Sequence, residues 1–205
     1  MKRFAFISAL IALCVISGCV TGSGSKNAAP TLDEVFITRR SIRAYEAGRT
    51  ISEAQLRELF EATQNAPSWA NYQPSKYYVA LSKEAHDAVL DKIGFNRDRV
   101  ANASALLVST YERGKSGYLQ GQQTNEIGEG WGAHDNGLSD AYLILKARAM
   151  GFDTLIMGMR DSDGLREIFD IPENETVMAV IALGYRAEEP RDPVHKPLDD
   201  FVKFF

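Results

Sequence analysis

Three short apolar runs constrain the fold of this 205-residue chain more than any other feature. They cover residues 105–110, 153–159 and 176–183, and the last is especially rich in Val and Ile. Such runs are typical of buried β-strands. Residues 76–81 form a fourth, more aromatic candidate strand. The strands alternate with predicted helices without a regular β-α-β repeat, so the sequence predicts a single α+β domain.

The predicted helices carry recognisable end signals. Thr31-Leu32-Asp33-Glu34 and Ser52-Glu53-Ala54-Gln55 are capping boxes that each open a helix. Further helices are predicted over residues 82–93, 138–150 (the longest, ended by Gly151) and 162–169. Residues 111–131 are polar and contain five glycines, which predicts a long loop or mobile short helices.

The amino terminus indicates export. Met1-Lys2-Arg3 is basic, residues 4–16 are apolar apart from one serine, and Ser17-Gly18 precede Cys19. The apolar run has the length of a signal peptide and is too short to span a bilayer. The pattern resembles a bacterial lipobox. It predicts a signal peptide over 1–18, a flexible tether over 19–30 and the folded domain over 31–205.

In that interpretation Cys19 is lipidated, and the protein is a membrane-anchored lipoprotein facing away from the cytoplasm, on the periplasmic side or at the cell surface. An ordinary secreted protein and an uncleaved anchor remain the alternatives.

Composition narrows the chemistry of the folded part. The two cysteines are Cys14, lost with the signal, and Cys19, so the body has no thiol for disulfide, nucleophilic or metal chemistry. The three histidines are not spaced as a zinc pair, so no metal site is predicted. A net charge of −4 argues against nucleic acid as a partner. Gly128-x-Gly130 lacks the third glycine of a dinucleotide fingerprint.

Two polar motifs follow the first two predicted helices. Arg39-Arg40-Ser41-Ile42-Arg43 places three guanidinium groups and a hydroxyl within five residues, a set suited to a phosphate. The alternative is a solvated basic face. Ala66-Pro67-Ser68-Trp69-Ala70-Asn71-Tyr72-Gln73-Pro74 could present polar groups to the edge of a planar ring, although an ordinary helix-to-strand turn has a similar composition.

Together these motifs resemble the nitroreductase family, which has an Arg-x-Ser-x-Arg/Lys element and then a Pro-Ser-x-x-Asn-x-Gln-Pro loop. Later segments continue the resemblance in order: 131–138, Leu155-Ile156-Met157-Gly158, Asp170-Ile171-Pro172-Glu173, 181–185 and His195-Lys196-Pro197-Leu198. It covers residues 31–205. Ser75 departs from the family, which often has Trp after Gln-Pro.

The resemblance implies a central mixed or antiparallel sheet flanked by helices, in a domain-intertwined homodimer with two FMN sites at the interface. Arg39, Arg40, Ser41 and Arg43 would hold the phosphate, ribityl chain and pyrimidine edge. The partner subunit would supply Pro67, Ser68, Trp69 and Asn71. Met157 and Gly158 would offer backbone to the isoalloxazine, and Lys196 would reach the phosphate. His195 stands where arginine is frequent and is either a further phosphate ligand or an exposed tail residue.

The implied activity is that of an FMN-dependent oxidoreductase. It would reduce nitroaromatics, quinones or similar small acceptors in a ping-pong cycle, with NAD(P)H or another donor stacking on the flavin. Phe95, Tyr118 and Trp131 are candidate pocket walls. No side chain is assigned as a catalytic acid or base. A non-catalytic flavin-binding lipoprotein, acting as redox carrier or cofactor store, and a flavin-free structural lipoprotein are the alternatives.

Overall fold

The computed structural model describes residues 29–205. The predicted signal peptide, the lipidation site Cys19 and most of the tether lie outside these residues. Within them, no helix combines the length and the apolar character needed to cross a membrane.

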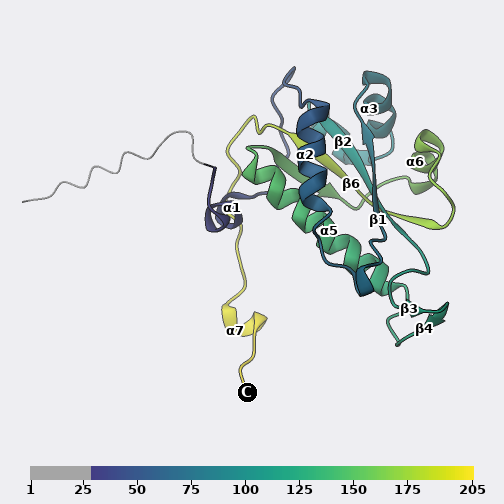
Figure 1. The fold of residues 1–205 in the computed structure, drawn as a ribbon. Coiled ribbons are helices and arrows are strands. Elements are labelled where there is room, and N and C mark those ends of the chain that lie inside the picture. The colour runs from purple at the N-terminus through teal and green to yellow at the C-terminus, as the bar shows by residue number, and fades with distance from the viewer. Residues whose placement is uncertain (1–28) are drawn as a thin grey trace, which may run out of the picture.

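A four-stranded antiparallel sheet forms the centre of the domain (Figure 1). The strand order is β1 (Ser75–Ala80), β2 (Ala105–Glu112), β6 (Glu175–Gly184) and β5 (Asp153–Met157). Tyr78 pairs with Val108, and Val108 pairs with Val180. The two central strands, β2 and β6, are almost wholly buried, which is why their sequences are continuous apolar runs.

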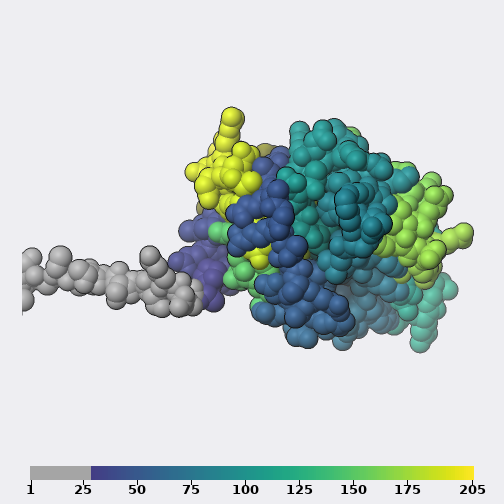
Figure 2. All heavy atoms as spheres, turned by 90° about the horizontal axis from the view of Figure 1, so that it is seen from above, coloured from purple at the N-terminus to yellow at the C-terminus, as the bar shows by residue number. Residues whose placement is uncertain are grey.

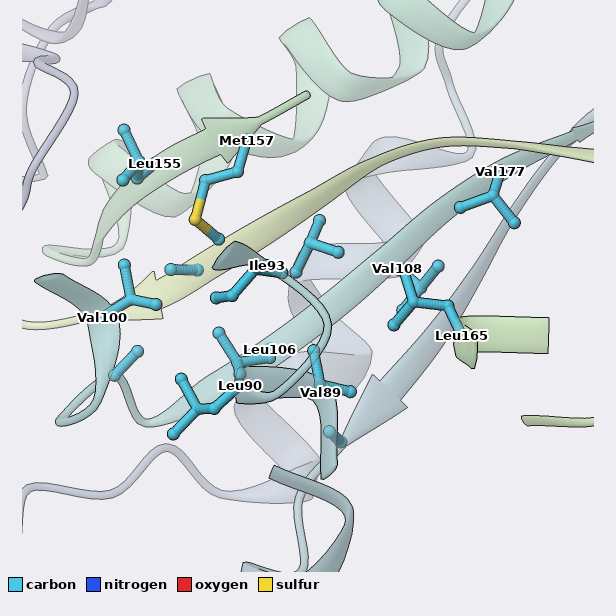
Figure 3. Packing of buried hydrophobic residues seen from close by; sticks show 14 of the residues in the cluster. Val89, Leu90, Ile93, Val100, Leu106, Val108, Leu155, Met157, Leu165 and Val177 are labelled. Carbon is cyan, nitrogen blue, oxygen red and sulfur yellow. The ribbon is translucent and has the colours of Figure 1, made fainter. Parts of the chain in front are cut away.

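Helices cover both faces of this sheet. Helices α2 (Glu53–Thr63) and α5 (Gly130–Ala149) pack together on one face, over a core that includes Leu59, Leu143 and Phe152. Helices α3 (Lys83–Leu90) and α6 (Ser162–Phe169) cover the other. Figure 3 shows that second core, with Met157 close to Ile93. The shorter elements are α1 (Leu32–Thr38), η1 (Trp69–Asn71), η2 (Gly94–Asn96), α4 (Arg97–Val100), β3 (Tyr118–Leu119), β4 (Gln122–Gln123) and α7 (Leu198–Phe201).

Both predicted capping boxes are confirmed. The Thr31 hydroxyl accepts a hydrogen bond from the Glu34 N–H at 3.3 Å, and the Glu34 carboxylate accepts one from the Thr31 N–H at 2.7 Å. Ser52 and Gln55 make the same reciprocal pair at the start of α2. The predicted helix over 162–169 has the observed bounds of α6.

Two predictions between residues 111 and 150 were wrong. Helix α5 begins at Gly130, not at residue 138. Its added turns bury polar residues such as Asp135 and Asn136, so they lack the apolar periodicity that predicts a helix. The predicted loop contains the hairpin β3–β4, whose turn residues Gln120 and Gly121 both have positive φ, 50° and 76°. Such a pair is the signature of a tight hairpin turn.

The carboxyl-terminal residues leave the body of the domain. Figures 1 and 2 show this tail as a projecting segment that ends beyond α7. It exposes five large apolar side chains: Val194, Leu198, Phe201, Phe204 and Phe205.

Candidate functional site

The arginine motif is placed beside the outer strand β5. Ser41 forms a parallel bridge with Thr154, and the Ile42 N–H donates to the Thr154 carbonyl at 3.0 Å. Ile42 is buried in the core, whereas Ser41 and Arg43 are exposed. Burial of the central isoleucine therefore directs its polar neighbours outward.

The three arginines of the motif have different surroundings. Within residues 29–205, the Arg39 side chain makes no hydrogen bond or ion pair, and Arg43 donates only to the Ser41 carbonyl, at 3.1 Å. Arg40 instead donates to the carbonyls of Ile37 and Arg39 and pairs with Asp192 at 3.2 Å. Arg39 and Arg43 therefore have guanidinium donors available for a ligand, whereas those of Arg40 are largely engaged within the chain.

A buried ion pair lies at the start of β5, next to the arginine motif. The Asp153 carboxylate accepts two hydrogen bonds from Arg186, at 2.9 and 2.6 Å, and lies 3.4 Å from Arg148. Arg148 also donates to the Thr38 hydroxyl at 3.0 Å, which ties the end of α1 to the last turns of α5. These residues border a polar cavity of about 430 Å³ that Arg40 also lines.

The end of β5 exposes backbone. Met157 is buried, but Gly158 is exposed, and a Cβ added there would meet nothing within 4 Å. Its φ is outside the left-handed region, so the fold does not require glycine at this position. The absence of a side chain leaves room for a flat ligand to approach the backbone.

The loop that carries Pro67, Ser68, Trp69 and Asn71 is held in an unusual conformation. Ala70, Asn71 and Gln73 have φ of 45°, 57° and 50°, values that non-glycine residues seldom adopt. The Trp69 N–H donates to the Asp135 carboxylate at 2.8 Å, and the Gln73 N–H donates to the Ser68 hydroxyl at 2.9 Å. Backbone strain of this kind persists only where surrounding contacts impose it, and it is concentrated at functional sites.

Asp135 holds this loop and was not assigned to the site from the sequence. It lies inside α5 with only 3% of its surface exposed. The carboxylate oxygen that binds the Trp69 N–H also accepts a hydrogen bond from the Ser116 hydroxyl at 2.5 Å. Asp135 therefore joins the loop to the segment that leads into the hairpin. Trp131 completes this cluster, with its ring 4.8 Å from that of Trp69.

Two further polar side chains lie near the end of β5 and were missed from the sequence. Gly94, in η2, lies beside the Met159 side chain, where an added Cβ would be 3.4 Å from the sulfur. The same element ends at buried Asn96, which accepts a hydrogen bond from Arg99 at 3.3 Å. No sequence pattern marks this pair, because its position depends on the packing of Ile93 and Val100 beneath β5 (Figure 3). Of the predicted pocket walls, Phe95 is exposed and Trp131 is partly buried.

The structure does not bring all predicted site residues together within one chain. The arginine motif lies near Arg148, while the loop is anchored at Asp135, 13 residues earlier on the same helix. At 1.5 Å per residue this places the two motifs roughly 20 Å apart along α5. His195 and Lys196 lie on the exposed tail, a few residues beyond Asp192. Within residues 29–205, no three His, Asp or Glu side chains converge as metal ligands.

Comparisons with known proteins all point to one family. The sequence profile of the Nitroreductase family matches residues 37–185. YdgI of Bacillus subtilis, whose name describes it as an NAD(P)H nitroreductase, is 26% identical over 200 residues, covering 83% of this chain and 96% of its own. A protein of Thermus thermophilus named NADH dehydrogenase is 28% identical and covers 84% and 96%.

A solved structure has the same fold. The crystal structure of a nitroreductase-type protein from Exiguobacterium sibiricum, in complex with FMN, superposes with a TM-score of 0.78. The match covers 87% of this chain and 99% of the other, at 22% identity.

Proposed function

The chain belongs to the nitroreductase family, and we propose that it is an FMN-dependent oxidoreductase whose two active sites form between the subunits of a homodimer. The observation that carries the proposal is the exposed backbone at Gly158, four residues after Thr154, the strand position that pairs with the arginine motif. The fold leaves open space where a planar ring would be bound, and it leaves guanidinium donors available on the adjoining segment.

The side chains present fit FMN. Arg39 and Arg43 offer unpaired guanidinium groups, and Ser41 between them offers a hydroxyl. Thr154, opposite Ser41, and Met157 are three residues apart, roughly 10 Å of extended strand, which one FMN molecule can span. Arg39 and Ser41 would hold the phosphate and ribityl chain, and Arg43 would lie at the pyrimidine edge. Lys196 and, as a second candidate, His195 would reach the phosphate from the tail.

A homodimer would bring the two motifs together. Because they lie roughly 20 Å apart along α5, a single chain cannot place both against one flavin ring. We propose that Pro67, Ser68, Trp69 and Asn71 serve the partner's site. An apolar groove of about 520 Å³ between α1 and α5, lined by Leu32, Phe36, Tyr142 and Leu145 among others, provides a contact surface, and the apolar tail provides another.

FMN would supply the two-electron chemistry, accepting electrons from a donor and passing them to an acceptor. Arg43 would place positive charge where the flavin becomes more negative on reduction, which favours the reduced form. The strained loop would cover the ring and exclude water. Donor and acceptor would bind in turn at one open face, a ping-pong cycle. Nitroaromatics and quinones are the proposed acceptors, and the names of relatives suggest NAD(P)H as donor.

The proposal includes export as a lipoprotein anchored through Cys19 on the outer side of a membrane. It rests on the sequence of residues 1–19. Cytoplasmic NAD(P)H would then be out of reach, so the donor would be another redox partner or a quinol. Wild type should incorporate a labelled fatty acid, and Cys19→Ala should not. Absence of label on wild type, or wild type found in the cytoplasmic fraction, would reject the anchor and leave NAD(P)H as the donor.

The first test is flavin content. The purified protein should be yellow with one FMN per chain, and a colourless protein that takes up no added FMN would reject the proposal. Arg39→Ala combined with Arg43→Ala should weaken FMN binding a hundredfold or more, because each lost charge-assisted bond costs about 1.5–3 kcal/mol. Arg57→Ala, which removes an exposed guanidinium on α2, is the matched control and should leave the affinity unchanged.

The second test is complementation between subunits. One variant carries Arg39→Ala and Arg43→Ala, and the other carries Ser68→Ala and Asn71→Ala. Each alone should bind FMN weakly, but a heterodimer of the two contains one site with both motifs intact. In the isolated heterodimer, tight binding should return at one of the two sites. No recovery in a verified heterodimer would show that each site lies within one chain.

Turnover separates an enzyme from the alternative of a flavin carrier. Steady-state assays with NAD(P)H or a quinol as donor and a nitroaromatic or quinone as acceptor should give parallel double-reciprocal lines. A flavin-loaded protein that turns over none of these pairs would favour the carrier.

A further inference from the structure

Arg160 forms a clamp at the end of β5. Its guanidinium donates to the Gly158 carbonyl at 2.7 Å and also to the carbonyl of Val177 on β6. The ladder between β5 and β6 ends at the pair Met157–Val180, so Arg160 continues the connection where β5 no longer offers backbone partners. One side chain thus ties the turn that follows Met157 to the neighbouring strand.

The clamp has an unfavourable feature. The Arg160 Nε atom is buried and has no hydrogen-bond partner among residues 29–205. A buried donor without an acceptor destabilises the folded state. An aliphatic side chain of similar length would avoid this loss. A costly group that persists at a candidate site suggests a role other than stability.

The clamp determines where the next peptide group points. The Gly158 carbonyl and the Met159 N–H belong to one planar trans peptide, so they point in opposite directions. With the carbonyl held by Arg160, the Met159 N–H points away from the guanidinium. The hydrogen bonds of the described residues leave that N–H without an acceptor. The Met159 side chain lies beside Gly94, where an added Cβ would be 3.4 Å from the Met159 sulfur.

We propose that Arg160 is a positioning residue for the flavin: by holding the Gly158 carbonyl against β6, it presents the Met159 N–H as a hydrogen-bond donor to the bound ring. The inference rests on the proposed function, because it takes the exposed backbone at Gly158 as the flavin-facing surface. A fixed donor stabilises the reduced ring more than the oxidised one, since reduction increases the negative charge on the acceptor atoms. Arg160 thereby raises the reduction potential without touching the flavin.

Two substitutions separate the clamp from the charge. Arg160→Met removes both, while Arg160→Lys keeps the charge but has a single nitrogen that cannot bridge both carbonyls in the same geometry. The readouts are the FMN dissociation constant in each redox state and the potential from dye equilibration. Both variants should lose about tenfold more affinity for reduced than for oxidised FMN, which lowers the two-electron potential by about 30 mV.

Arg166→Met is the matched control. Arg166 also clamps backbone carbonyls, those of Pro172 and Glu175, but neither carbonyl lies in β5 or in the turn that follows it. It should lower thermal stability and leave the potential unchanged. A wild-type potential in both Arg160 variants would overturn the proposal, and so would a wild-type potential in Arg160→Lys alone, since charge would then account for the effect. Failure of wild type to bind FMN would instead reject the proposed function.

A measurement on wild type keeps the proposal testable even if the Arg160 variants do not fold. The chain has five methionines, so selective ¹⁵N-methionine labelling gives a simple amide spectrum, in which Met159→Leu identifies one signal. Added FMN should shift the Met159 amide more than those of Met150 and Met178. A Met159 signal that does not move in a protein that has bound FMN would overturn the proposal.

Discussion

Replacing Gly158 with alanine should stabilise the apoprotein and weaken FMN binding, two effects of opposite sign from one methyl group. A Cβ at this position meets nothing within 4 Å, and the backbone is not in the left-handed region. At such a position Gly→Ala stabilises by about 0.4–1 kcal/mol, because the unfolded chain loses conformational freedom. For a domain of this size, that raises Tm by about 1–4 °C.

The same methyl group would occupy space that the proposed site gives to the flavin. Added atoms in a close-packed contact typically cost about 1–3 kcal/mol, which corresponds to a loss of roughly 5- to 150-fold in FMN affinity. Calorimetry of the apoprotein and titration of flavin fluorescence measure the two effects separately.

Gly137→Ala is the matched control for this substitution. Gly137 lies in helix α5, and a Cβ there also meets nothing within 4 Å. It should raise the free energy of unfolding by about 0.5–1 kcal/mol through helix propensity, and therefore raise Tm, without changing FMN affinity. The reasoning is refuted if Gly158→Ala binds FMN as tightly as wild type, or if it destabilises the apoprotein.

Three further predictions concern other parts of the structure. Asp135→Asn removes the charge that accepts hydrogen bonds from the Trp69 N–H and the Ser116 hydroxyl, each worth about 1.5–3 kcal/mol. FMN affinity should fall, and amide exchange in the β3–β4 hairpin should accelerate. Unchanged exchange would contradict the role of Asp135 in joining the loop to the hairpin. Burial raises the pKa of Asp140 above its usual value, an effect that hydrogen bonds from Ser109 and Tyr77 only partly offset. The folded state therefore holds that proton more tightly than the unfolded state. As pH rises from about 4 through the folded pKa of Asp140, the free energy of unfolding of the protein decreases. Asp140→Asn should thus be more stable than wild type at pH 7, with the difference shrinking in acid; denaturant melts at several pH values test the sign. Deleting residues 194–205 removes the five exposed apolar side chains of the tail and should shift the protein from dimer towards monomer in sedimentation velocity, whereas a dimer of unchanged stability would exclude the tail from the interface.

Local features of the sequence were sufficient to predict several elements. The central strands β2 and β6 are recognisable because burial on both faces requires continuous apolar residues. The capping boxes at Thr31 and Ser52 and the bounds of α6 are predictable because their hydrogen bonds join residues three or four positions apart. The arginine motif and the Pro67–Pro74 loop were identified by residue type and order alone.

Only the tertiary structure decided how those motifs are used. Arg40 forms an ion pair with Asp192, 152 residues later in the chain, and no local sequence pattern predicts that pair. The first turns of α5 are helical although their buried face is polar, because Asp135 and Asn136 find partners on other segments. The loop in which Ala70 and Asn71 have positive φ is held, through the Trp69 N–H, by a carboxylate on a helix that begins almost 60 residues further on. The roughly 20 Å between the two motifs is set by their positions along α5, and the proposal of a site shared between two subunits rests on that distance. These features depend on contacts between residues distant in sequence, whose geometry exists only once the chain has folded.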